Sequence, residues 1–187
     1  MHIAAEKGHI GVINAIILKG EDVNVLTNDN FSALHLAIDA GRPEVVECLL
    51  GHGANVKIKG GSENETPLHM ACRLGMKNAY FRSSFDKIKV LIPTKILIDE
   101  LQLILGDTRG EKCVRMLLKS GANPNLPLTD GRTPLHISAQ VGGSRNIRLL
   151  LENGANISTE DKVGESAIHK AIRGCHYKPL KVHLHIL

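Results

Sequence analysis

A repeat of about 33 residues limits what this chain can fold into more than any other feature of its sequence. Histidine recurs in register at His2, His35, His69, His136 and His169, so that successive histidines are 33, 34, 67 and 33 residues apart. The interval of 67 residues equals two periods. A unit of this length has too little apolar surface to form a core alone, so we expect the units to stack side by side.

A short word surrounds four of these histidines and marks the start of a helix. It reads SALH at 32–35, TPLH at 66–69, TPLH at 133–136 and SAIH at 166–169. A Ser or Thr before a helix accepts a hydrogen bond from an unpaired backbone N–H, and proline is tolerated at the first helical position. Glycines six residues beyond the histidine then favour a left-handed turn that ends the helix after about two turns. These glycines are Gly8, Gly41, Gly75 and Gly142.

A second helix is predicted in each unit from apolar residues at helical spacing. They are Val45, Val46, Leu49 and Leu50 in the second unit and Ile147, Leu150 and Leu151 in the fourth. Gly53, Gly121 and Gly154 follow and end this helix. The polar stretches at 27–30 and 128–131 carry the Asp, Asn and Gly that tight turns favour, and they predict protruding hairpin loops.

The period and the TPLH word resemble those of ankyrin repeats. This resemblance implies an all-α ankyrin-repeat solenoid of helix-turn-helix pairs with short β-hairpin loops. We expect about five repeats. They are a partial repeat at 1–26, complete repeats at 27–60 and 128–160, an interrupted repeat at 61–127 and a truncated repeat at 161–187. The shortened ends suggest a fragment of a longer array.

The third repeat carries an insertion near 77–110. Its histidine and its terminal glycine are 52 residues apart, whereas the same interval is 18 residues in the first, second and fourth repeats. Three interpretations stay open: a translated intron or other gene-model error, a functional loop, and a degenerate extra repeat. In a genuine loop, Ile98, Leu101, Ile104 and Leu105 have the spacing of an amphipathic helix.

Composition excludes several other classes of protein. Hydrophobic residues make up 43% of the chain and charged residues 22%, which is typical of a folded domain and not of a disordered one. The net charge of +4 comes without a basic run, so no nucleic-acid partner is expected. No stretch reaches the roughly 18 apolar residues of a membrane span, and we expect no signal peptide, because no basic region followed by an apolar stretch stands near residue 1. The four widely spaced cysteines indicate a reducing compartment, and we expect a cytoplasmic protein.

The sequence indicates neither catalysis nor metal binding. The five repeated histidines share one position, and the ankyrin resemblance implies that their rings bind neighbouring hairpin backbone. Cys175, His176, His183 and His185 are suitable zinc ligands, but their spacing matches no standard zinc finger. The run Gly60-Gly61-Ser62 lacks the remaining residues of a phosphate-binding loop. We therefore predict a protein that is not an enzyme, with no catalytic, cofactor-binding or metal-binding residues.

Several words resemble the cytoplasmic repeats of TRPN mechanosensory channels, the no-mechanoreceptor-potential C type. They are Gly53-Ala54-Asn55-Val56, the segment 65–69 and the segment 116–125. This resemblance implies an elastic tether that joins a membrane pore to microtubules, although the chain itself holds no pore segment. The alternatives are a stand-alone cytosolic adaptor and the regulatory repeats of an enzyme whose catalytic domain is missing.

The ankyrin resemblance places partner-binding residues on the concave face, at the hairpin tips and on the first helix of each pair. A protein partner is expected there, beside the contacts with neighbouring ankyrin repeats. The positions that match are Asn28, Asp29, Phe31, Asp39, Glu63, Glu65, Arg73, Asp130, Arg132, Gln140, Lys162, Glu165 and Arg173.

Overall fold

The structure is a computed structural model that describes residues 1–74 and 108–174. Within these ranges the chain forms helix pairs, and we call the first helix of each pair helix A and the second helix B. The A helices are α1 (His2–Lys7), α3 (Ala33–Asp39), α5 (Pro67–Arg73), α9 (Pro134–Gln140) and α11 (Ala167–Arg173). The B helices are α2 (Ile10–Leu18), α4 (Pro43–Gly51), α8 (Thr108–Lys119) and α10 (Ser144–Glu152).

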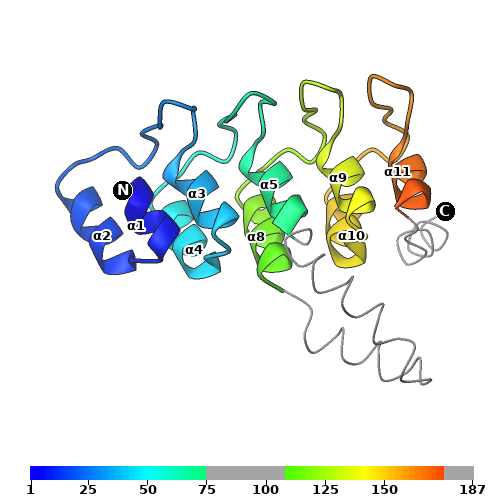
Figure 1. The fold of residues 1–187 in the computed structure, drawn as a ribbon. Coiled ribbons are helices and arrows are strands. Elements are labelled where there is room, and N and C mark those ends of the chain that lie inside the picture. The colour runs from blue at the N-terminus through cyan, green and yellow to red at the C-terminus, as the bar shows by residue number, and fades with distance from the viewer. Residues whose placement is uncertain (75–107, 175–187) are drawn as a thin grey trace, which may run out of the picture.

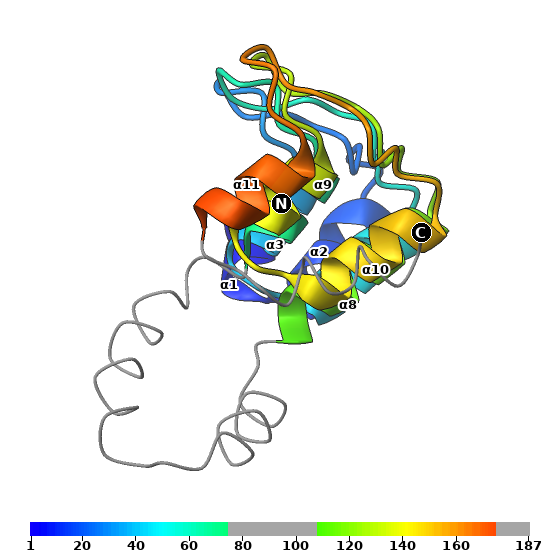
Figure 2. The same cartoon turned by 90° about the vertical axis from the view of Figure 1, so that its right-hand side faces the viewer.

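The helix pairs stack in chain order into two layers (Figure 1). Each A helix contacts the A helix of the next repeat, and the B helices contact one another in the same way. The connecting loops all rise along one side of the stack, and they overlap when the molecule is viewed along it (Figure 2). The predicted all-α solenoid is confirmed.

The loops are simpler than β-hairpins with paired strands. The described residues contain isolated antiparallel bridges, at Leu26 with Ser32, Gly60 with Glu65 and Glu160 with Ser166, and no strand. Neighbouring loops are joined by single backbone hydrogen bonds. Their donors and acceptors are Gly61 N and Asp29 O (2.9 Å), Thr129 N and Glu63 O (3.2 Å), and Lys162 N and Asp130 O (3.0 Å). The turns are too short to extend into a ladder.

The predicted bounds of the insertion stay a prediction. Helix α8 begins at Thr108, three residues before Glu111, which is the position equivalent to the first residue of α2, α4 and α10. Residues 108–110 therefore add one turn to helix B of the third repeat. In this turn Arg109 packs on Gly41 of the preceding repeat, where a Cβ atom would lie 3.5 Å from its guanidinium. The rest of the insertion, including the possible helix at 98–105, lies outside the described residues, as do Cys175, His176, His183 and His185.

The repeated histidine joins its A helix to a loop. The backbone N–H of Ser32 donates to Nδ1 of His35 at 3.2 Å, which leaves the ring proton on Nε2. Nε2 then donates to the carbonyl oxygen of Glu65, at the base of the next loop, at 3.2 Å. His136 bonds the carbonyl of Glu165 in the same way at 3.0 Å, whereas His2 bonds the carbonyl of Val25 within its own repeat at 2.9 Å. The predicted structural role of the histidines is confirmed for these residues.

Burial keeps these rings neutral. The side chains of His35 and His69 have no exposed surface, and burial lowers the pKa of each to about 4. Nε2 of His69 faces the backbone of Leu126 and Arg132 but has no hydrogen-bond partner within the described ranges. A second proton on either ring would add a charge to the core. It would sit on Nδ1, which accepts the backbone N–H of the cap residue, so two hydrogen-bond donors would face each other.

Two asparagines, each four residues after the glycine that ends helix B, form hydrogen bonds between neighbouring repeats. Asn24 Oδ1 accepts the backbone N–H of Asn55 at 2.7 Å, and Asn125 Oδ1 accepts that of Asn156 at 2.7 Å. Each bond joins one repeat to the next. The equivalent residue between the second and third repeats is Lys57, whose ammonium group has no lone pair and cannot accept a hydrogen bond.

We predict that the free energy of unfolding falls as the pH is lowered from about 6.5 toward 4. Between these values the unfolded histidines take up protons while the folded His35 and His69 stay neutral, so the unfolded state binds more protons. The loss reaches up to about 3 kcal/mol for each histidine. Urea unfolding at about pH 7.5, 6 and 5 measures it.

Substitution of both His35→Gln and His69→Gln provides the control. Glutamine keeps a capping acceptor at this helical position but does not titrate in this range. The double variant should lose most of the pH dependence between pH 7.5 and 5 that the unmodified chain shows. Equal slopes in the two proteins would contradict the assignment to these rings.

We also predict that Lys57→Asn stabilises the chain by about 1 kcal/mol, because the new Oδ1 can accept the backbone N–H of Asn123 as Asn24 and Asn125 do for their neighbours. Thermal and urea unfolding would register the gain. Lys57→Met is the matched variant, since it removes the charge without adding a carbonyl acceptor. A similar gain in both variants would attribute the effect to charge removal.

Candidate functional site

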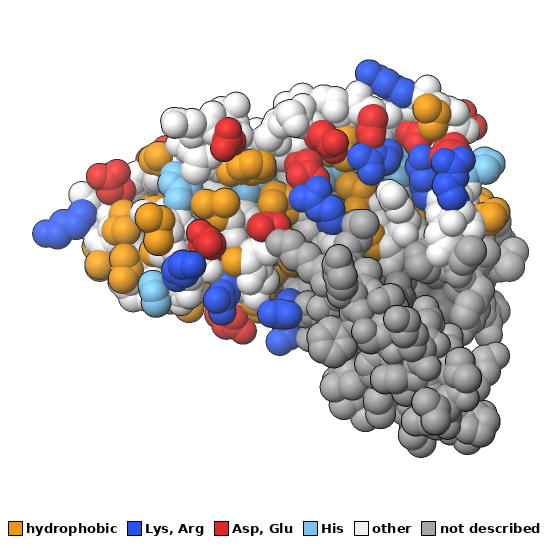
Figure 3. Space-filling view, viewed as in Figure 1, with side chains coloured by type: hydrophobic (Ala, Val, Ile, Leu, Met, Phe, Trp, Pro, Cys, Tyr) orange, Lys and Arg blue, Asp and Glu red, His pale blue; other side chains and the backbone are white. Residues whose placement is uncertain are grey.

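The candidate residues occupy a few equivalent positions of the repeat. The residue before the helix A cap, here called the loop-base position, is Phe31, Glu65, Arg132 or Glu165. The last residue of helix A, here called the helix-end position, is Asp39, Arg73, Gln140 or Arg173. A third position near the loop tip holds Asp29, Glu63 and Asp130. Acidic and basic side chains alternate between the loops and the A helices in the right-hand half of Figure 3.

In the third repeat, the loop base is joined to the end of its own helix by an ion pair. Arg73 binds Glu65 through two contacts, Nη1 to Oε1 at 2.5 Å and Nη2 to Oε2 at 3.1 Å. The Glu65 side chain is only 10% exposed, whereas that of Arg73 is 40% exposed. This bidentate geometry fixes the direction of both side chains.

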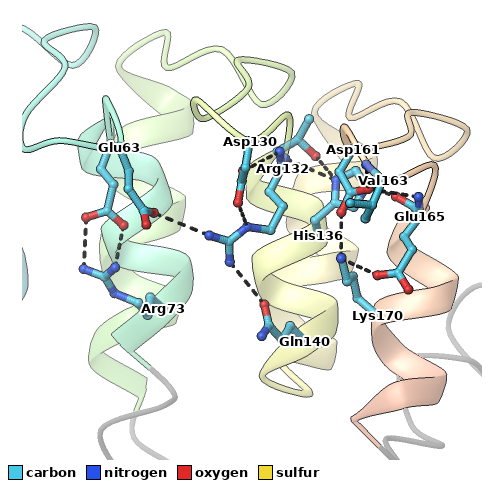
Figure 4. A network of polar contacts seen from close by, with 12 residues as sticks. Glu63, Arg73, Asp130, Arg132, His136, Gln140, Asp161, Val163, Glu165 and Lys170 are labelled. Atoms are coloured by element: carbon cyan, nitrogen blue, oxygen red, sulfur yellow. Dashed lines mark hydrogen bonds and ion pairs between the residues drawn. The ribbon is translucent and has the colours of Figure 1, made fainter.

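In the fourth repeat, Arg132 gathers acceptors from three elements (Figure 4). Its Nε donates to Asp130 Oδ2 at 2.5 Å, and its Nη2 donates to Glu63 of the preceding loop at 3.4 Å. Its Nη1 donates to Gln140 at the end of α9 at 3.4 Å. Partial burial opposes ionisation of Asp130, but the backbone and guanidinium N–H groups of Arg132 lower its pKa. Arg132 therefore links two repeats.

The fifth repeat contains the most buried charges of the face. Lys170 Nζ lies 2.6 Å from Asp161 and 2.5 Å from Glu165, and Arg173 also pairs with Glu165. Asp161 Oδ1 accepts the backbone N–H groups of Val163 and Glu165 at 3.0 and 2.9 Å. Burial opposes ionisation here too, yet Lys170 and the two N–H groups lower the pKa of Asp161 to about 2.

Asp161 and Lys170 were absent from the sequence-based candidates. A signal for Lys170 was present in the repeat, because the equivalent residues are Leu36, Met70 and Ile137. A lysine at an otherwise apolar position needs an acidic partner when it is buried. The partner could not be identified from spacing alone, since Glu160, Asp161 and Glu165 all lie nearby in the sequence.

The second repeat has an aromatic loop base. The ring of Phe31 lies on Gly60 and Gly61 of the next loop, where added Cβ atoms would come within 2.5 and 2.9 Å of it. Its edge meets His35, with ring centroids 5.6 Å apart and an interplanar angle of 64°. The glycines that prompted comparison with a phosphate-binding loop are thus explained by close approach of an aromatic ring.

The structure brings the candidates together in groups within this face. Glu65 pairs with Arg73, Arg132 with Glu63, Asp130 and Gln140, and Glu165 with Arg173. Asp29 and Lys162 join neighbouring loops through backbone atoms. Asn28 and Asp39 are exposed. These ion pairs fix the positions of several candidate side chains on one face of the stack.

The described residues contain no group of three or more His, Cys, Asp or Glu side chains arranged to hold a metal ion. Among the described helices, none has the length and apolarity that crossing a membrane requires.

Comparison with known proteins identifies a shared repeat. A family model described as ankyrin repeats in three copies matches residues 1–98 and 105–182. The chain is 32% identical over 129 residues to the probable 26S proteasome regulatory subunit p28 of Saccharomyces cerevisiae, a match covering 67% of the chain and 56% of that protein.

Two further relatives carry different names. Ankyrin repeat and SOCS box protein 16 of Homo sapiens is 26% identical over 152 residues, covering 76% of the chain and 33% of that protein. Phosphocholine transferase AnkX of Legionella pneumophila is 26% identical over 174 residues, covering 92% of the chain and 15% of that protein. The chain thus spans only part of the length of each relative.

We predict that Gly60→Ala displaces Phe31 and destabilises the chain by about 1 to 2 kcal/mol, because the new methyl group overlaps the ring. Urea unfolding measures the loss. The same substitution in a Phe31→Ala background should cost less, since the clash is then absent. An equal cost in both backgrounds would locate the strain in the backbone beside Asn30 and not in the ring contact.

Proposed function

The chain belongs to the ankyrin-repeat family, and we propose that it is a non-enzymatic module that binds a protein partner across the A helices and loops. The relatives support this proposal because their names denote different activities, while the chain covers only part of each. A repeat array common to such proteins fits recognition better than one particular reaction.

The observation that carries the proposal is a contrast between constant and variable positions in the chain itself. The cap is always Ser or Thr and the third helical residue is always His in α3, α5, α9 and α11. The loop-base position, in contrast, is Phe, Glu, Arg or Glu, and the helix-end position is Asp, Arg, Gln or Arg. Stacking requires the constant residues. The variable positions lie on one face, and the residue type at each of them can differ between repeats to match a partner.

The composition of this face favours a protein as the ligand. Arginine and aromatic residues contribute disproportionately to protein–protein binding energy, and Phe31, Arg73 and Arg173 supply both types. Ion pairs within the face hold several side chains in place before binding. Such preorganisation lowers the entropy that ordering the interface would otherwise cost.

A cytosolic adaptor is the form of this function that we favour. Within the described residues, Cys48, Cys72 and Cys113 form no disulfide bond, which suits a reducing compartment and supports a cytoplasmic location. An elastic tether of a TRPN-like channel, with microtubules as a partner, remains the second candidate. It rests on the sequence words at 53–56, 65–69 and 116–125, and the relatives described above add no support to it.

We predict that Gln140→Glu combined with Arg173→Glu weakens partner capture by at least about tenfold, because both substitutions change the charge of the proposed binding face. The full chain would be immobilised, and captured proteins would be cross-linked and quantified by mass spectrometry. A binding partner is one that the unmodified chain enriches and that the face variant loses.

The matched control is Lys112→Gln combined with Arg148→Glu, two exposed residues on the B helices whose substitution lowers the net charge by the same amount. This variant also alters two charges but leaves the proposed face unchanged, so it should retain the partner. Loss of the partner in the B-helix variant alone would place binding on the opposite layer and overturn the proposal. Circular dichroism of both variants checks that the repeats remain folded.

A further inference from the structure

The proposed binding face carries a different charge in each repeat. The segment from the loop to the end of helix A contains two acidic and no basic residues at 27–40, and two acidic and one basic at 61–74. It contains one of each at 128–141, and two acidic and three basic at 161–174. The second repeat is therefore the most acidic part of this face, and its own segment supplies neither lysine nor arginine.

The fourth repeat shows what its loop-tip and helix-end positions can bind. Arg132 Nε donates to Asp130 Oδ2 at 2.5 Å, and Nη1 of the same guanidinium donates to Gln140 at 3.4 Å (Figure 4). One guanidinium is thus held between the loop and the end of helix A of a single repeat.

The second repeat has acceptors at the same two positions. Asp29 stands three residues before the cap, as Asp130 does, and Asp39 stands four residues after the histidine, as Gln140 does. The loop-base residue between them is Phe31, which has no hydrogen-bond donor on its side chain. A carboxylate accepts several hydrogen bonds, so contacts that either aspartate makes within the chain leave room for a further donor.

These positions stay accessible when a repeat lies on both sides. The fourth repeat stands between the third and the fifth, yet the side chain of Asp130 is 46% exposed and Gln140 is exposed as well. Asp29 and Asp39 are also exposed. Their accessibility follows from their place at a loop tip and a helix end, and it does not depend on what adjoins the first repeat.

We propose that Asp29, Phe31 and Asp39 form a binding site for an arginine side chain of the partner protein. The inference rests on the proposed function, because the arginine belongs to the protein that the face binds. A planar guanidinium can span two separate acceptors, as Arg132 does, whereas a lysine ammonium concentrates its charge at one point. The half-buried ring of Phe31 adds a surface on which a guanidinium can stack, and its contacts with Gly60 hold it in place.

The test selects peptides of random sequence, displayed on phage, on the immobilised full chain. We expect arginine to be enriched at one position of the recovered peptides. In a synthetic copy of the most enriched peptide, replacement of this arginine by citrulline, its neutral counterpart, should raise the Kd by at least about tenfold, because the charge-assisted hydrogen bonds are lost. Fluorescence polarisation measures both affinities.

Asp29→Asn combined with Asp39→Asn preserves the size of both side chains and removes their charge. The arginine and citrulline peptides should bind this double variant within about twofold of each other, because the peptide and protein changes act on the same interaction. Glu44→Gln combined with Glu47→Gln is the matched control, since it removes the same charge from exposed positions on α4 of the same repeat. It should keep the tenfold difference.

Phe31→Arg is a second test that leaves both aspartates in place. It puts a guanidinium of the chain itself at the loop base, as in the fourth repeat, and should also abolish the difference between the two peptides.

A difference that persists in the Asp29 and Asp39 double variant would overturn the arginine site, as would enriched peptides without arginine. In both cases binding of the peptides to the A-helix and loop face would still support the proposed function. Loss of the difference in the α4 control as well would overturn the site by attributing the effect to net charge. Failure of the proposed function gives a different result, namely peptides whose binding is lost in the Lys112→Gln and Arg148→Glu variant.

Discussion

The hydrogen bonds of the repeated histidine hold the structure in register. Nδ1 accepts the backbone N–H of the cap residue, and Nε2 binds a carbonyl on the following loop, as His35 does with Glu65 and His136 with Glu165. One neutral ring therefore starts a helix and positions the next repeat. The carbonyls that it binds belong to loop-base residues, so the scaffold directly fixes the backbone from which the candidate binding side chains project.

The binding face adds a second level of order to this scaffold. Glu65 with Arg73 connects a loop to its own helix, and Arg132 connects two successive loops. Pairs at exposed sites contribute little to stability on their own, because water screens them and side-chain entropy opposes them. Their main effect here is to orient the face. A partner would meet side chains that are already placed, and Arg173 remains 75% exposed despite its ion pair with Glu165.

The sequence by itself determined the period and the helix caps Ser32, Thr66, Thr133 and Ser166. These features depend on residues a few positions apart or on a spacing that repeats, so they can be read along the chain. The ankyrin resemblance implied the role of the histidines and the candidate face, and the face stays a prediction. Only the tertiary structure decided which charges pair, because Arg132 and Glu63 are 69 residues apart and several carboxylates have similar spacing. It also decided that Phe31 lies on Gly60, that α8 begins at Thr108, and that Val12 is exposed while Val45 is buried. Identical residues at equivalent positions can differ in this way because burial depends on the neighbour in the stack and not on the residue itself.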